Sequence, residues 1–145
     1  MEDHPAGRIL IVDDNKEHRE ALGRVLTQAG YHVVGLASDG KDALALLGRT
    51  PVDLIIADLR MPGMGGLELL KRVKPRWPSI QVIILTAFGD VISHAEAMEH
   101  GASQFLSKPV RRAEILAQTR IAVQEARAVE SAIARDPGNG RGPEE

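Results

Sequence analysis

The chain contains no cysteine among its 145 residues, which excludes disulfide bonds, thiolate metal sites and cysteine nucleophiles. Its formal net charge is only −2, which gives no support for bulk binding of nucleic acid or membrane surfaces. No apolar run approaches the ~18 residues of a membrane-spanning helix, and the opening MEDHPAGR lacks the apolar segment of a secretory signal. We therefore expect a cytoplasmic protein of one folded domain, with no membrane partner and no direct binding of nucleic acid.

Short apolar runs alternate with amphipathic segments along the chain. Five runs predict strands: Arg8–Val12, His32–Ala37, Leu54–Ala57, Gln81–Leu85 and Gln104–Ser107. Five segments predict helices: Lys16–Ala29, Lys41–Gly48, Leu67–Lys74, Asp90–His100 and Arg111 to about Ala134. Such alternation implies an α/β fold, a doubly wound five-stranded parallel sheet with five helices on its two faces.

The stretch VDLIIADLRMPGMGG organises the rest. Its apolar residues predict a strand buried on both faces, and Asp58 stands at the carboxyl end of that strand. The loop that follows is rich in Pro and Gly and cannot continue the strand. Because ligands of open parallel sheets bind outside the carboxyl ends of the strands, Asp58 is a candidate reactive group.

Other strands end in polar side chains too. Asp13 and Asp14 follow the first strand, Thr86 ends the fourth and Lys108 follows the fifth. In a parallel sheet these groups meet Asp58 at one edge, where three carboxylates would repel unless a cation lies between them. An oxygen-only ligand set fits Mg²⁺ best. A divalent ion with Lys108 would attract a phosphoryl group, and Asp58 could accept it as a nucleophile.

In this order and spacing, these motifs resemble the receiver domain of bacterial two-component response regulators. The matching motifs are Asp13-Asp14, Asp58 with Met61-Pro62-Gly63, Thr86-Ala87 and Lys108-Pro109. The resemblance covers roughly residues 8–122 and implies a flavodoxin-like strand order of 2-1-3-4-5. The segment from Leu85 to Val110 is also similar to receivers of the nitrogen-regulation class, which activate transcription.

The resemblance implies a role for each motif residue. Asp58 accepts a phosphoryl group from a sensor histidine kinase or a phosphotransfer protein. Mg²⁺ is held directly by Asp14 and Asp58, through water by Asp13, and by the backbone carbonyl of Arg60. Lys108 pairs with the phosphoryl oxygens and precedes a cis peptide bond.

The resemblance also implies a switch. Thr86 moves to bond the phosphoryl group, and Phe105 changes rotamer into the space that Thr86 leaves. The surface that reports the switch is the fourth helix, fifth strand and fifth helix. We further hypothesise that Arg60 and Phe88 control the access of water to the phosphoryl group.

The last predicted helix is longer than the fold requires. We expect a flexible lead (1–7), a receiver domain (8–122), an extension of the last helix (123–134) and a disordered tail or linker (135–145). Five residues of this helix follow coiled-coil spacing: Thr119, Ala122, Ala126, Val129 and Ile133. They suggest a homodimer through the last helix, against the alternative of a frayed amphipathic end.

Two other functions stay open at this point. One is a protein-interaction module on the same fold that works without phosphorylation. The other is a hydrolase with an aspartate nucleophile, but that class usually carries a second Asp two residues later, where this chain has Arg60. The leading interpretation is a phosphoacceptor signalling domain that is not an enzyme in the usual sense.

Overall fold

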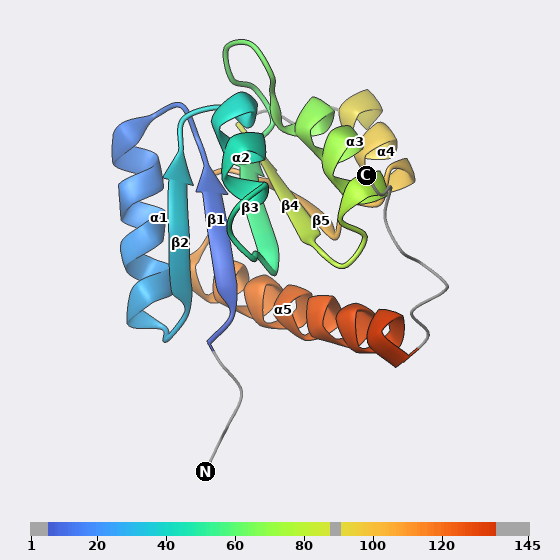
Figure 1. Cartoon of the computed structure of the whole chain (residues 1–145). Helices are drawn as coiled ribbons and strands as arrows, with labels where there is room; N and C mark the ends of the chain where they lie inside the picture. The colour runs from blue at the N-terminus through green and yellow to red at the C-terminus, as the bar shows by residue number, and fades with distance from the viewer. Residues whose placement is uncertain (1–5, 88–90, 136–145) are drawn as a thin grey trace.

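The structure, a computed structural model, describes residues 6–87 and 91–135 and holds a five-stranded sheet with five helices (Figure 1). The strands are β1 (Arg8–Val12), β2 (His32–Ala37), β3 (Leu54–Asp58), β4 (Gln81–Thr86) and β5 (Gln104–Ser107). The helices are α1 (Lys16–Gln28), α2 (Gly40–Leu47), α3 (Gly66–Arg76), α4 (Val91–Glu99) and α5 (Arg112–Arg135). All ten predicted elements are confirmed, with most ends within one or two residues of the predicted ones.

The strands are parallel and lie in the order β2-β1-β3-β4-β5, as expected. The central strand β3 is flanked by β1 and β4, and its first four residues are buried. This order brings the carboxyl ends of β1, β3, β4 and β5 to one edge of the sheet. None of the helices in the described ranges has both the length and the apolar character needed to cross a membrane.

Side chains that alternate along each strand form two cores, one on each face of the sheet. Ile55 and Ile84 belong to the core that α2, α3 and α4 cover. Ile56 and Ile83 belong to the other core, which α1 and α5 cover. Figure 1 shows the same layers, with the long helix α5 running beneath the sheet. The strands are therefore buried on both sides, as their continuous apolar runs predict.

One helix ends later than the sequence predicts, and the start of another cannot be compared because it lies outside the described residues. Helix α3 continues through Pro75 to Arg76, two residues further than predicted, and the Trp77 N–H closes it by donating to the Val73 carbonyl at 2.7 Å. Proline removes one helical donor, but in a last turn the neighbouring bond suffices. The described part of α4 begins at Val91, and the predicted start at Asp90 lies outside the described residues.

Helix α5 is continuous over 24 residues. Thr119, Ala122 and Ala126, three of the five predicted coiled-coil residues, are fully buried within the chain itself. A partner helix cannot reach them, so the predicted seam is wrong at these positions. The physical reason is that coiled-coil spacing and packing on a sheet both need one apolar stripe, and here the sheet takes it.

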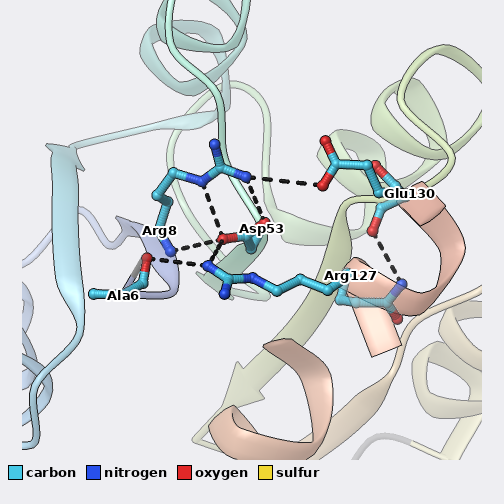
Figure 2. Close-up of polar contacts among 7 residues, drawn as sticks. Ala6, Arg8, Asp53, Arg127 and Glu130 are labelled. Carbon is cyan, nitrogen blue, oxygen red and sulfur yellow. Dashed lines mark hydrogen bonds and ion pairs between the residues drawn. The ribbon is translucent and has the colours of Figure 1, made fainter. Parts of the chain in front are cut away.

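The extended part of α5 is tied to the amino ends of β1 and β3 by charged groups (Figure 2). Asp53 is a buried carboxylate with 2% of its surface exposed. It accepts from the Arg8 backbone N–H at 2.8 Å and from the Arg8 guanidinium at 3.1 and 2.8 Å. Arg127 of α5 donates to Asp53 at 3.4 Å and to the Ala6 carbonyl at 3.2 Å, and Glu130 lies 3.9 Å from Arg8.

Gly7 also belongs to this end of the molecule. It is buried, and its carbonyl accepts from the His32 N–H at 2.8 Å. Two residues of the lead predicted over 1–7, Ala6 and Gly7, therefore make defined contacts with α5 and β2. Residues 1–5 and the predicted tail from 136 onward lie outside the described residues.

Candidate functional site

Three carboxylates meet at the carboxyl edge of the sheet. Asp13 and Asp14 follow β1, and Asp58 ends the neighbouring strand β3. One oxygen from each lies within 4.8 Å of the others. Asp13 is buried, Asp58 is half-buried and Asp14 is exposed, so the cluster opens to solvent on one side. The convergence predicted from the sequence is present in the structure.

Lys108, from the loop after β5, lies between two of these carboxylates. Its ammonium nitrogen is 2.6 Å from Asp58 Oδ1 and 3.3 Å from Asp13 Oδ2. The peptide bond between Lys108 and Pro109 is cis, as the family resemblance implied. The Lys108 N–H donates to the Thr86 carbonyl at 2.7 Å, which fixes this loop against the end of β4.

The electrostatics of the cluster follow from burial and like charge. Burial raises the pKa of Asp58, the negative charge of Asp13 adds to the rise, and contact with Lys108 offsets only part of it. Burial alone would lower the pKa of Lys108, but Asp58 and Asp13 together raise that pKa above its usual value. Lys108 is therefore charged at neutral pH, whereas burial and the charge of Asp13 disfavour the ionised form of Asp58.

The loop after Asp58 folds back closely onto the acceptor strand. A Cβ at Gly65 would collide with the Leu59 carbonyl oxygen, and a Cβ at Gly66 with that of Asp58. The Gly66 N–H donates to the Leu59 carbonyl at 3.0 Å. Only glycine allows this approach, so the two glycines hold the start of α3 beside Asp58.

The predicted switch residues lie beside the cluster. Thr86 is buried at the end of β4, and Phe105 is half-buried on β5. Arg60 lies on the acceptor loop, two residues after Asp58, and its side chain is exposed. Phe88, the other residue expected to control water access, lies outside the described residues.

A mainly apolar hollow of about 650 Å³ adjoins the cluster. Asp13 and Lys108 form part of its lining, and Ala21, Leu22 and Val110 are among its apolar residues. These come from α1 and from the loop between β5 and α5. The carboxylates thus stand at the edge of a surface on which an apolar side chain of another protein could pack.

The residues present fit a magnesium ion. Three carboxylates carry three negative charges, Lys108 supplies one positive charge between Asp58 and Asp13, and the buried Asp58 Oδ1 accepts no well-directed hydrogen bond. A hard divalent cation prefers oxygen ligands and would relieve this excess of negative charge. Asp13, Asp14 and Asp58 supply the donor set that such an ion needs.

The sequence model of the response regulator receiver domain matches residues 9–120, which is most of the chain. The chain belongs to the response regulator receiver family. The receiver domain is 43% identical over 103 residues to the DNA-binding transcriptional regulator NtrC of Klebsiella pneumoniae, a match that covers 71% of this chain and 22% of NtrC. Relatives of this kind agree with the resemblance to nitrogen-regulation receivers.

Solved structures show the same fold. The receiver domain matches the signal receiver domain of an HD domain-containing protein from Pseudomonas fluorescens Pf-5, with a TM-score of 0.84 and 30% identity over 90% of this chain and 96% of that one. It also matches a chain of the CheX-CheY-BeF3-Mg complex of Borrelia burgdorferi, with a TM-score of 0.73, 28% identity and coverage of 78% and 86%. The chain spans about a quarter of the length of several curated relatives that it matches.

Sequence reasoning missed two residues of this receiver domain. Asp53 directly precedes the central strand and pairs with Arg8, the first residue of the adjacent strand β1. An acid directly before an apolar run, with a cation at the start of another run, was the available signal. His94 is exposed and stacks on Phe105, and the sequence carries no signal for that contact.

Proposed function

We propose that this receiver domain is a phosphoacceptor and that Asp58 takes a phosphoryl group from a phosphohistidine of a sensor histidine kinase or a phosphotransfer protein. The observation that carries the proposal is the convergence of Asp58 with Asp13, Asp14 and Lys108. An Asp58 oxygen attacks phosphorus, the P–N bond to the donor histidine breaks, and the histidine leaves with the electron pair of that bond. The receiver domain works as a signalling module, not as an enzyme that turns over a separate substrate.

Each residue of the site has a defined part in this proposal. Asp13, Asp14, Asp58 and the backbone carbonyl of Arg60 would hold Mg²⁺, which neutralises charge on the transferred group. Lys108 now binds Asp58 directly, so its ammonium is in place to bind a phosphoryl oxygen once Asp58 is modified. The same contact explains how the acid cluster is tolerated before modification.

The proposed output is a shift between two packings. Thr86 and Phe105 follow the new charge, and the surface of α4, β5 and α5 then presents a different face to an output partner or domain. Control of transcription is the output that the NtrC-type relatives suggest. The match covers only about a quarter of these relatives, so the activities of the whole proteins also depend on segments that the match does not include.

The hollow beside Lys108 supports docking of the phosphoryl donor. Its lining includes Lys108, whose ammonium contacts Asp58, so a donor that packs there would bring its phosphohistidine close to the Asp58 carboxylate. We also propose residues 8–122 as the receiver unit and 123–134 as a helical extension. A homodimer through α5 would have to use its outer face, where Ile121 is 52% exposed.

Two alternatives are weaker. A module that works without phosphorylation would not need three carboxylates around one lysine. An aspartate-based hydrolase would need an acid at position 60, where this receiver domain carries an exposed arginine.

Incubation with acetyl phosphate and Mg²⁺, followed by intact mass spectrometry, tests the proposal. We expect the mass of one phosphoryl group on the wild type, and none on Asp58→Asn or in the presence of a chelator. Glu114→Gln, an exposed carboxylate on α5, is the matched control and should be modified like the wild type. A wild type that never gains the group would favour the phosphorylation-independent module, and sustained hydrolysis of phosphoesters would favour the hydrolase.

A further inference from the structure

An aromatic stack joins α4 to β5. The imidazole of His94 lies over the ring of Phe105, with ring centroids 4.8 Å apart and planes inclined by 10°. Ala97 is the one residue of α4 buried within the described range, and Lys71 of α3 pairs with Glu96. The stack is therefore one of the contacts that hold α4 against the sheet.

The first two residues of α4 present apolar side chains to solvent. Val91 is 84% exposed and Ile92 is 79% exposed, although both are large and apolar. A helix with a small buried face and an exposed apolar end has little packing energy that fixes its position. Contacts such as the stack of His94 then decide where α4 lies.

Phe105 is placed to connect this helix with the site. In the parallel register Phe105 lies beside Ile84 on β4, and Thr86 is two residues further along the same strand. Residues two apart in a strand share a face, so Thr86 and Phe105 both lie on the face that α4 covers. His94 is the outer layer over Phe105, which in turn neighbours the buried hydroxyl-bearing residue at the site.

We propose that His94 is a positioning residue of the switch: its stack holds Phe105 in the rotamer seen here and transmits a change of that rotamer to α4. The inference rests on the proposed phosphoacceptor function and adds a residue to it. Because the stack stabilises only the unmodified packing, it lowers the population of the binding-competent state and with it the apparent affinity for a phosphoryl group. Aromatic pairs of this kind shift an equilibrium by about two- to tenfold.

NMR with beryllium fluoride and Mg²⁺, a mimic of the phosphoryl group, tests the first half of the inference. Stacking on Phe105 places the His94 ring protons in the ring current of their neighbour, and their resonances are assigned by their absence in His94→Ala. We expect these resonances to move when the mimic binds, while those of His100, beyond the end of the same helix, stay in place. Fluorine NMR of the bound mimic reports binding independently.

A titration of the mimic tests the second half. We expect His94→Ala to bind beryllium fluoride about two- to tenfold more tightly than the wild type. His94→Phe keeps an aromatic ring over Phe105 and should restore the wild-type affinity, and His100→Ala should leave it unchanged. In a Phe105→Leu background, His94→Ala should have no further effect, because its partner is already gone.

The outcomes separate the two proposals. If the mimic does not bind the wild type at all, the phosphoacceptor function fails. If the mimic binds but the His94 resonances do not move, or if His94→Ala and His100→Ala bind it equally, the role of His94 is refuted while the function stands. Thermal melting of each variant confirms that it is folded, which the exposed position of both histidines favours.

Discussion

Replacement of Asp53 by Asn should destabilise the protein strongly, although Asp53 lies at the opposite end of the sheet from the phosphoacceptor. Asp53 accepts three hydrogen bonds from Arg8 and one from Arg127. Breaking a buried ion pair costs about 3–5 kcal/mol. Arg8 and Arg127 keep 28% and 26% of their side chains exposed, so solvent relieves part of that cost. We expect a loss of about 2–3 kcal/mol, or roughly 6–12 °C in Tm.

The effect should also depend on pH. Burial alone would raise the pKa of Asp53, but the hydrogen bonds from Arg8 and the charges of Arg8 and Arg127 together hold that pKa below its usual value. An acid whose pKa is lowered by folding stabilises the protein above its unfolded pKa of about 4. That stability is lost as the pH falls through the folded pKa. The gap between wild type and Asp53→Asn should therefore be full at pH 7 and close in strong acid.

Urea denaturation followed by circular dichroism, at pH 7 and at a series of lower pH values, measures both effects. Glu125→Gln is the matched control, because it makes the same charge change at an exposed carboxylate of α5 and should alter the free energy of unfolding by less than about 0.5 kcal/mol. A loss at Asp53 no larger than at Glu125, or a loss that does not shrink in acid, would refute the reasoning about the buried network.

Three further predictions concern the phosphoacceptor site. Asp58→Asn should raise the Tm of the metal-free protein by a few degrees. Burial and Asp13 raise the pKa of Asp58, so its ionisation at pH values above the ordinary carboxyl range opposes folding. Millimolar Mg²⁺ should raise the Tm of the wild type but not of Asp58→Asn, and differential scanning fluorimetry measures both effects. Lys108→Ala should bind Mg²⁺ about tenfold more tightly by calorimetry, because a competing cation is removed, yet accept phosphoryl groups more slowly. Arg60→Ala should change the rate of autodephosphorylation, measured by loss of the phosphorylated mass, and an unchanged rate would remove the hypothesis that Arg60 controls water access.

The strands and helices could be predicted from the sequence because its apolar runs and its Gly and Pro breakers indicate the same ten elements, whereas the strand order came from the family resemblance. Residues 54–57 are apolar without alternation, and the structure buries that strand on both faces. The convergence of Asp13, Asp58 and Lys108 followed from the rule that parallel strands end at one edge. These inferences need only the spacing of the apolar residues and the direction of the chain through each strand, and both can be taken from the sequence.

What the sequence could not provide was the partner of each side chain. The apolar spacing of Thr119, Ala122 and Ala126 fits both a coiled coil and a helix packed on a sheet, and only the structure shows that the sheet covers them. The stack of His94 on Phe105 joins residues on separate elements without any periodic pattern. The pairing of Asp53 with Arg8 depends on strand register, which composition does not fix.

The most direct test of the central claim is to locate the phosphoryl group on the chain. After treatment with acetyl phosphate and Mg²⁺, borohydride reduces an aspartyl phosphate to homoserine, and tandem mass spectrometry of the peptides identifies the converted residue. The geometry predicts homoserine at position 58, at no other carboxylate, and only when Mg²⁺ is present. Conversion at Asp13 or Asp14 instead, or equal conversion at Asp58 without the metal, would contradict a site built around Asp58.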